Sequence, residues 1–291
     1  MSVVTLSSTA EVGAIVIESG NVTLDLSADL RISSIQVKAG AQLVKSGTGK
    51  FVLPSSTTQT TVPLNVTGGA VVFNSDPGSQ SDYPLDVTAS AGGHVEFQHS
   101  AHLHALNLES SSSAVLAEGD SRLLRLKSLS VDPANSFLDL SDNDLIIDNE
   151  DGANSATTIY NWIIAGAARE TGMVNGLMWT GNGIKSHVAA QYAANFDQKH
   201  ILGFQDNATL GFTSFDGEDV HSHSLLVKFT YREDLNFNGL IDDNDVDIFS
   251  GNYNEGQPAN WSGGDIDFDG FISANDSIIF GVEYSLSSPQ L

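Results

Sequence analysis

Residues 85–97 read LDVTASAGGHVEF: an alternating apolar stretch, a turn of small residues with two glycines, and a second alternating stretch. Alternation with a period of two is the spacing of a β-strand, because successive side chains point to opposite faces. Glycine permits the backbone conformations that a tight bend requires. The stretch therefore predicts two short strands joined by a bend, a unit that needs neighbours to bury its apolar face.

The same unit recurs along the first 150 residues. Five further copies show the two apolar stretches and the short turn between them, and they begin at Ile15, Ile35, Leu64, Leu106 and Leu129. Ordered together with Leu85, the starting residues lie 20, 29, 21, 21 and 23 residues apart, and an insertion around residues 54–63 is expected to account for the long step. A period of about 20 residues is typical of solenoid proteins, whose repeats contact only their neighbours.

The alternation and the turns favour one kind of solenoid. Leucine-rich repeats share the period, but the copies lack the Leu-x-x-Leu-x-Leu frame and the Asn ladder of that class. We predict a mainly β fold, a right-handed parallel β-helix of about six coils over residues 1–150, whose stacking builds one narrow core. The bends are expected at five glycines: Gly40, Gly68, Gly69, Gly92 and Gly93.

Two neighbouring stretches carry a family resemblance. Residues 43–53 read LVKSGTGKFVL, with a lysine before small residues and glycines, and residues 64–74 read LNVTGGAVVFN, a strand broken by two glycines. With the threonine-rich spacer between them, they resemble the autotransporter-associated β-strand repeat. The resemblance implies a β-helix and implies no chemical activity.

The segment at residues 151–232 changes character. Apolar residues at helical spacing predict a helix over Thr157–Arg169, and Ser186 is placed to cap a second short helix. A glycine-rich loop around Trp179 lies between the two helices, and two strands are expected at residues 200–204 and 225–231. Because the open end of a solenoid exposes unpaired backbone and core, we interpret this segment as an α+β cap.

The composition of the 291 residues limits the classes of function. Acidic residues outnumber basic ones by 36 to 12, a formal charge of −24, so nucleic acid is not expected as a partner. Cysteine is absent, which excludes disulfides and thiolate metal sites, and no apolar run is long enough to span a membrane. The N-terminus lacks the pattern of a signal peptide, so a secreted protein of this sequence is expected to be a mature or excised piece with an added Met1.

Two acidic loops near the C-terminus share one pattern. Residues 234–245 read DLNFNGLIDDND and residues 265–276 read DIDFDGFISAND, with Gly239 and Gly270 at position 6, where the chain must turn sharply. Hard oxygen ligands at this spacing suit Ca²⁺, and we predict two calcium sites. The expected ligands, at positions 1, 3, 5, 7 (by its backbone carbonyl), 9 and 12, are Asp234, Asn236, Asn238, Leu240, Asp242 and Asp245, and Asp265, Asp267, Asp269, Phe271, Ser273 and Asp276.

The flanks of the loops distinguish them from EF-hands, which have a helix on both sides. Here a strand pattern precedes the first loop, the stretch ending at Pro258 precedes the second, and only residues 246–249 and 277–280 are expected to be helical. This succession of a loop and then a helix occurs twice in close sequence, and it resembles the dockerin type I module. The resemblance places a paired calcium-loop module at residues 233–291.

The resemblance extends upstream of the loops. Residues 180–184, 202–211 and 227–231 resemble a C-terminal module of secreted proteins of planctomycetes and related bacteria, in which the module follows a β-helix that ends in a phrase like residues 138–148. It implies a secreted or cell-surface protein and no particular activity.

The ligand sets differ in charge. The second loop offers four carboxylates against three in the first, so we expect the second site to bind calcium more tightly. Position 12 is an aspartate in both loops, Asp245 and Asp276, which favours a static structural site over a sensor. Ile241 and Ile272 at position 8 are expected to pack on each other.

Three other groups of residues are candidates. His94, His99, His102 and His104 lie close in sequence, with His102 and His104 expected on one strand face; zinc or copper binding is weighed against surface histidines. Asp139, Asp142, Asp144 and Asp148, with Arg122, Arg125 and Lys127 one coil earlier, are weighed as a polysaccharide-active site or as solvated turns. Trp162, Trp179 and Trp261 are expected to pack in the core more readily than to stack on sugars.

Three functions remain open from the sequence. The first is a non-enzymatic extracellular or cell-surface structural or adhesive protein with two structural Ca²⁺ ions. The second is an interaction module that docks on a cohesin-like partner or assembles with copies of itself; residues 243–244 and 274–275, at loop positions 10 and 11, depart from many cohesin-binding dockerins. The third is a β-helix enzyme acting on a polysaccharide, with a glycan as its partner.

Overall fold

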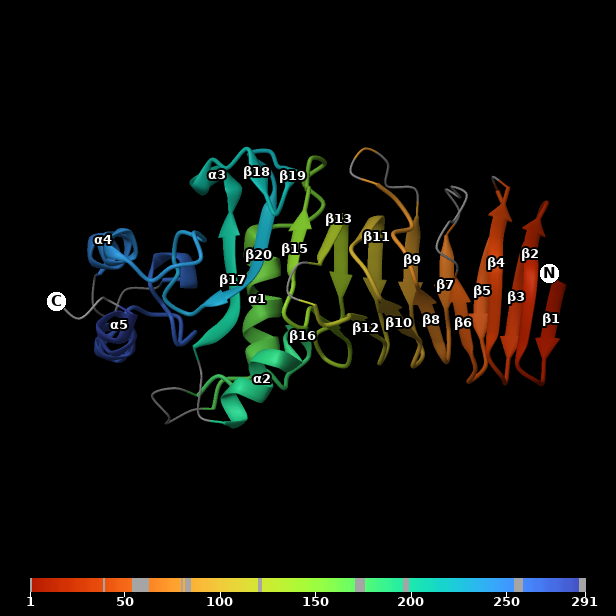
Figure 1. The fold of residues 1–291 in the computed structure, drawn as a ribbon, viewed down its shortest axis with the longest axis horizontal. Helices are drawn as coiled ribbons and strands as arrows, with labels where there is room; N and C mark the ends of the chain where they lie inside the picture. Colours follow the sequence, from red (N-terminus) through yellow and green to blue (C-terminus); the bar gives the residue numbers. More distant parts are fainter. Residues whose placement is uncertain are drawn as a thin grey trace.

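The computed structural model describes residues 2–38, 40–53, 63–79, 81, 85–119, 122–170, 176–195, 199–253 and 259–287. The fold is mainly β and contains a parallel β-solenoid of about six turns. Figure 1 shows the coils stacked along the long axis of the molecule, with the N-terminus at one end and the helices α4 and α5 at the other. The predicted solenoid is confirmed.

Each coil contributes one strand to each of two sheets, which face each other across the core. The parallel strands of the first sheet are β1 (Ser2–Leu6), β3 (Asn21–Leu26), β5 (Gln42–Ser46), β7 (Leu64–Val66), β9 (Asp86–Ala89), β11 (Ala101–Leu108), β13 (Leu123–Val131) and β15 (Asp144–Ile147). Those of the second sheet are β2 (Ala10–Ile17), β4 (Leu30–Val37), β6 (Lys50–Leu53), β8 (Ala70–Phe73), β10 (His94–Phe97), β12 (Ser113–Leu116), β14 (Phe137–Asp139) and β16 (Gly183–Lys185).

The interior is built from columns of aligned apolar side chains. Val95 of β10 lies in register with Val71 of β8 and Ala114 of β12, and all three are fully buried. In the next column Phe97 stacks on Phe73, with ring centroids 5.2 Å apart. Each coil therefore completes the apolar surface of its neighbours, as expected of a solenoid.

The predicted insertion around residues 54–63 is wrong as an explanation of the long step between repeats. Leu43 of β5 aligns with Val22 of β3 behind it and with Leu64 of β7 ahead of it, and these two steps along the chain are equal in length. The coil that contains the supposed insertion is therefore no longer than the coil before it. Residues 54–62 themselves lie outside the described part.

The long step arises from a change of phase in the repeats. The units beginning at Ile15 and Ile35 pass from the second sheet to the first, whereas the later units pass from the first sheet to the second. Both kinds of bend use small residues, so the sequence pattern does not distinguish one from the other.

One glycine at a predicted bend shows why the residue is required. Gly69 has φ +61°, and a Cβ atom there would lie 2.4 Å from the carbonyl oxygen of Gly47 in the preceding coil. Beside it, the fully buried Lys45 donates from Nζ to the carbonyls of Ser46, Gly47 and Gly68 at 2.8–2.9 Å. Burial lowers the pKa of Lys45 to about 8, while Asp25 and Asp29 act in the opposite direction.

The predicted cap contains the expected elements. It consists of α1 (Ala156–Ala167), α2 (His187–Ala194), β17 (His200–Asp206), α3 (Asn207–Leu210), the hairpin strands β18 (Ser214–Phe215) and β19 (Glu218–Asp219), and β20 (Leu225–Tyr231). Ser186 caps α2 as predicted, accepting from the backbone amide of Ala189. Helix α1 ends two residues before the predicted end because Ala168 adopts a left-handed conformation, with φ 46°.

The parallel stacking ends within the cap. Leu138 of β14 pairs with Ile184 of β16, and the connection between them is longer than in the other coils because it contains α1. In the first sheet β20 pairs with β15 in the antiparallel direction, and β17 then pairs antiparallel with β20. One cluster of buried apolar residues continues from the solenoid through the cap to Phe280.

The described residues of the C-terminal region include three helical segments. These are α4 (Asp243–Asn252), a short 3-10 turn at Trp261–Gly263 and α5 (Ala274–Ser287). Among the described residues, no helix combines the length and the apolar character needed to cross a membrane. The boundaries expected at residues 150 and 232 stay predictions.

Candidate metal centre

The two predicted calcium loops lie between β20 and α5. The first follows β20 directly and the second follows the 3-10 turn, and each leads into a helix, α4 or α5. Asp242 caps α4, accepting from the amide of Asn244. Each loop is therefore followed by a helix; among the described residues, the strand β20 precedes the first loop and the 3-10 turn precedes the second.

The loops share an unusual backbone conformation at two positions. At position 4, Phe237 and Phe268 have φ values of 63° and 57°; at position 6, Gly239 and Gly270 have φ values of 83° and 93°. A bulky residue at positive φ costs on the order of 1 kcal/mol. Both phenylalanines are buried, which offsets this cost. The repetition of the same strained position indicates one loop conformation used twice.

The aspartate at position 1 organises each turn. Asp234 accepts from the backbone amides of Asn238 and Gly239, each at 3.0 Å. Asp265 accepts from the equivalent amides of Asp269 and Gly270, each at 2.9 Å. Each carboxylate therefore faces the inside of its own loop.

The aspartate at position 12 closes each loop from the following helix. Asp245 accepts from the amides of Asn236 at 3.3 Å and Asp242 at 2.9 Å. Asp276 accepts from the amides of Ile266 at 3.0 Å and Ser273 at 2.8 Å. The first helical turn is thus bound to both ends of the loop.

The remaining predicted ligands follow the same turns. The side-chain oxygens at positions 3 and 5 accept from backbone amides two residues further along, at 2.8–3.1 Å; these residues are Asn236, Asn238, Asp267 and Asp269. At position 7 the side chains of Leu240 and Phe271 are exposed, as expected if only their carbonyls serve the loop. At position 9, Ser273 donates to Asp276 at 3.0 Å. Ile272 is buried and Ile241 half-buried.

The carboxylates of the second loop converge. Ligand oxygens of Asp265, Asp267 and Asp269 lie within 4.8 Å of one another. Among the described residues, these three side chains are the group close enough together to share a metal ion. The side chains of Asp265 and Asp267 are fully buried, whereas Asp269 is partly exposed. Like charges this close, removed from water, repel each other unless a cation accompanies them.

The pKa values reflect this confinement. Burial raises the pKa of Asp234 to about 6 and that of Asp265 to about 7, with the charges of Asp245 and Asp276 adding to the effect. Burial also raises the pKa of Asp245, Asp267 and Asp276. A divalent cation would reverse these shifts, because it favours the ionised carboxylates. The donor set, carboxylate, amide, hydroxyl and carbonyl oxygens, fits Ca²⁺.

Side chains of the cap hold both loops in place. Thr230 of β20 donates its hydroxyl to Asp234. Tyr160 of α1 accepts from the amide of Trp261 at 2.8 Å, and its ring lies 5.9 Å from that of Phe268. Burial and the nearby Asp265 raise the pKa of Tyr160, so its hydroxyl stays protonated. The fully buried Trp261 donates from Nε1 to the backbone carbonyl of Arg232, and Trp179 is buried against Phe268, confirming core packing for these two tryptophans.

One functional residue escaped the sequence analysis. Arg169, just beyond the end of α1, places its guanidinium NH2 2.9 Å from Asp267 and 3.7 Å from Asp269. It lies 98 residues before its partner in the chain. Only the surplus of carboxylates in the second loop hinted that a cation would be near.

Within the described ranges, His94, His99, His102 and His104 are not among the residues whose ligand atoms lie close enough together to share a metal ion. His102 contacts Asp76 at 2.6 Å and Glu218 at 3.4 Å, and His104 contacts Asp86 at 2.7 Å. His94 contacts the hydroxyl of Ser113 at 2.7 Å. Each of these histidines thus has its own partner. His102 is buried and His104 exposed, and the expected placement on one strand face is interrupted: Leu103 and Leu106 are both fully buried, and the pairing of β11 with β13 skips His104.

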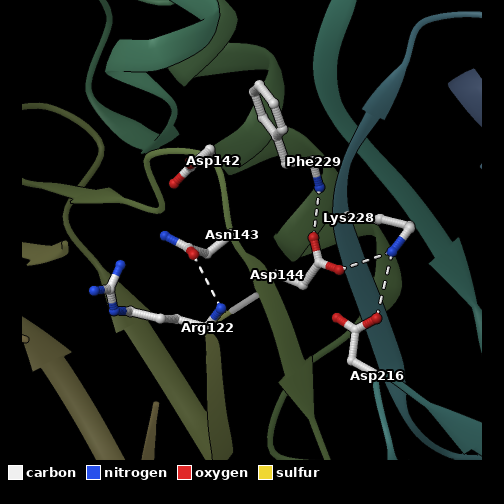
Figure 2. A pocket seen from close by; sticks show the side chains of 7 residues that line it. All are labelled: Arg122, Asp142, Asn143, Asp144, Asp216, Lys228 and Phe229. Carbon is white, nitrogen blue, oxygen red and sulfur yellow. Dashed lines mark hydrogen bonds and ion pairs between the residues drawn. The ribbon is translucent and has the colours of Figure 1, made fainter. Parts of the chain in front are cut away.

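The acidic edge of the last coil divides into two parts. Asp139 contacts His187 at 3.1 Å and Asp148 forms an ion pair with Arg125 at 2.9 Å, so both serve the structure. Asp142 and Asp144 instead line a pocket of about 270 Å³. Figure 2 shows its other walls, which come from distant parts of the chain: Arg122, Asn143, Asp216, Lys228 and Phe229.

A buried carboxyl lies at the centre of this pocket. Asp144 accepts from the amide of Phe229 at 2.7 Å and from Lys228 Nζ at 2.9 Å, and Nζ also lies 3.4 Å from Asp216 (Figure 2). Burial and the neighbouring Asp216 raise the pKa of Asp144 despite Lys228. Arg122 donates to the carbonyls of Gln98 and Ala117, and it makes no ion pair within the described ranges.

No protein-family model, curated protein or solved structure matches the chain. Its function is therefore inferred from the geometry of the loops and the pocket.

Proposed function

We propose that this protein is an extracellular or cell-surface structural or adhesive protein, in which a right-handed β-helix carries a C-terminal dockerin-like module with two structural Ca²⁺ ions. Residues 233–291 supply both sites. The calcium ions act as clamps: they fix each loop to the helix that follows it and to the cap below.

The observation that supports this proposal best is the repetition of the loop geometry. Residues 234–245 and 265–276 each hold an aspartate at position 1 on the amides of positions 5 and 6, and an aspartate at position 12 on amides near the loop's start. Four of these carboxylates are fully buried: Asp234, Asp245, Asp265 and Asp276. Burying so many carboxylates is costly unless a cation neutralises them.

The structural role follows from mass action. An ion that binds only the folded module stabilises it by about 2.7 kcal/mol at a free concentration one hundred times Kd. The short aspartate at position 12 is already hydrogen-bonded to the loop in both sites, so calcium binding would not need to move the helix that follows. We therefore expect calcium to rigidify the module without a large change of shape.

Calorimetric titration of the chelator-treated full chain tests the proposal. We expect two equivalents of Ca²⁺ for the natural chain. The double variants Asp234→Asn with Asp245→Asn, and Asp265→Asn with Asp276→Asn, should each retain one. A natural chain that binds no calcium, and whose melting temperature is the same with and without chelator, would contradict the proposal.

The pocket favours a second candidate function, binding of or action on a glycan. Arg122 and Lys228 offer positive donors, Asp144 and Asp216 a pair of carboxyls joined through Lys228, and Phe229 an apolar wall. Sugars are recognised by such combinations of polar groups and an aromatic face. A glycan array with the natural chain and Asp144→Asn tests it, with Asp148→Asn as the control outside the pocket. Equal signals from the natural chain and Asp144→Asn would exclude this role for the pocket.

A further inference from the structure

The two loops differ in charge at two positions. Positions 3 and 5 carry the amides Asn236 and Asn238 in the first loop and the carboxylates Asp267 and Asp269 in the second. At positions 1 and 12 both loops have aspartate. Position 9 is Asp242 in the first loop and a serine in the second, so the additional negative charge of the second loop is concentrated at Asp267 and Asp269.

Arg169 is directed at these two carboxylates. Its NH2 group forms a close ion pair with Asp267 at 2.9 Å and lies 3.7 Å from Asp269. The side chain of Asp267 is fully buried and that of Arg169 is 20% exposed, so solvent screens this pair less than it would a surface pair. The Nε atom of Arg169 is buried and has no hydrogen-bond partner in the described structure. Its polar contacts are thus directed to the loop.

The backbone that carries Arg169 is fixed by packing. The carbonyl of Ala167 accepts from the amides of both Met178 and Trp179, at 2.9 Å each. Gly181 lies so close to the same helix end that a Cβ atom there would be 1.9 Å from the carbonyl oxygen of Ala165. The C-terminal end of α1 is therefore held in place by packing, and this fixes the position of the Arg169 guanidinium beside the second loop.

We propose that Arg169 is a built-in counter-ion that sets the calcium affinity of the second loop. This inference rests on the proposed function. Four carboxylates and one guanidinium carry the same net charge as the three carboxylates of the first loop. Calcium that enters the second loop must share the Asp267 carboxylate with the guanidinium of Arg169 or displace that guanidinium. Either outcome weakens the binding of calcium. The two loops therefore bind calcium with similar affinity, in place of the tighter second site expected from the ligand count.

The same contact acts on the calcium-free protein. Arg169 neutralises part of the carboxylate cluster when no metal is bound, so the second loop keeps its attachment to α1. The ion pairs between described residues include none that joins a ligand of the first loop to an arginine or lysine. Removing calcium should loosen the first loop more than the second.

Titration of the full chain with Ca²⁺ tests the inference. The first loop is disabled by Asp234→Asn with Asp245→Asn, so that heat reports on the second. In this background Arg169→Gln should bind calcium about five- to tenfold more tightly, the range of a partly screened ion pair, whereas Arg169→Lys, which keeps the charge, should stay closer to the parent. An unchanged or weaker affinity in Arg169→Gln overturns the inference.

Two controls separate the possible failures. With Asp267→Asn and Asp269→Asn also present, Arg169→Gln should have no further effect on affinity, because its partners are gone; an equal gain there overturns the inference. Hydrogen exchange of residues 265–276 in chelator should be faster in Arg169→Gln than in the parent. If the natural chain binds no calcium at all, the proposed function fails; if it binds two ions and Arg169→Gln changes nothing, the role of Arg169 alone fails.

Discussion

The solenoid and the loop module are stabilised in opposite ways. In the solenoid, apolar side chains such as Val71, Val95 and Phe97 occupy aligned positions in successive coils, where they are buried from water. In the module, buried carboxylates take the central positions, and apolar residues such as Phe268 surround them. The difference implies that the solenoid is stabilised mainly by the burial of apolar side chains, whereas we expect the stability of the module to depend on calcium.

Removing a core ring should produce the largest effect, and it should be independent of calcium. Phe97→Ala leaves a cavity beside Phe73, and substitutions of this kind cost about 3–5 kcal/mol. Chemical denaturation should show this loss equally in calcium and in chelator. Val16→Ala, at a side chain 52% exposed, is the matched control and should change little. A loss of stability that becomes smaller when calcium is added would contradict the proposed difference between the two regions.

Disabling a loop should produce the next largest effect, and only when calcium is present. Asp265→Asn should remove about 2–4 kcal/mol of calcium-dependent stabilisation of the module. In chelator the same variant should be neutral or stabilising, because burial raises the pKa of Asp265 to about 7 and the charged carboxylate is unfavourable there. Thermal melts of the natural chain and the variant, with and without calcium, measure both. A loss of equal size in chelator would assign Asp265 a purely structural role.

A charged residue inside the solenoid provides a sharper test of the contrast. Lys45→Met should cost about 1–3 kcal/mol, because the carbonyls of Ser46, Gly47 and Gly68 lose their donor. The loss should not depend on calcium, since β5, the strand that contains Lys45, lies far along the molecule from α4 and α5 (Figure 1). Lys50→Met, at an exposed ion pair, is the control. A variant as stable as the natural chain would contradict the role of this ammonium group.

The smallest effect concerns pH. His102 is buried between Asp76 and Glu218, with Arg125 on the far side of Glu218. Burial opposes protonation, but the two carboxylates outweigh it and raise the pKa of His102. Its contribution is fully present below the unfolded pKa near 6.5 and is lost as the pH rises through the folded pKa. We expect under about 1 kcal/mol.

The pH dependence can be measured on calcium-free protein by denaturation between pH 6 and 8. His102→Gln should reduce the part of the pH dependence that comes from this histidine, and His104→Gln, at an exposed ion pair on the same strand, is the matched comparison. Equal slopes for the natural chain and His102→Gln would show that the carboxylates do not hold the proton on the ring.

Local patterns predicted much of this fold. Strand alternation identified the solenoid, and helical spacing with Ser186 identified α1 and α2, whereas α3 and the β18–β19 hairpin were not predicted. The candidate ligands of the loops could be listed because each loop is a continuous segment, and their binding of calcium stays a prediction. The phase of the repeats, that is, the sheet in which each unit begins, could not be predicted, because the bends on both sides of the coil consist of the same small residues.

Contacts between distant segments were beyond the sequence. Arg169 meets Asp267 across 98 residues, and Lys228 meets Asp144 across 84. Arg125 was set beside the acidic edge as one candidate group, whereas the structure separates Asp148, which it neutralises, from Asp144, which lines the pocket. Only the fold decides which charges become neighbours, since one residue of shift along a strand moves a side chain to the other face.

The antiparallel direction of β20 makes the two ends of the first sheet different from each other. A further coil must lay two strands in parallel register on both sheets, and at the capped end the first sheet closes with the antiparallel pair β20 and β17. At the other end β1 and β2 are the edge strands of the two sheets, with Val3 and Val4 exposed. The two ends of the described solenoid are therefore unlike: a neighbouring β-sheet would meet the edges of parallel strands at β1 and β2, and the edge of an antiparallel strand at β17.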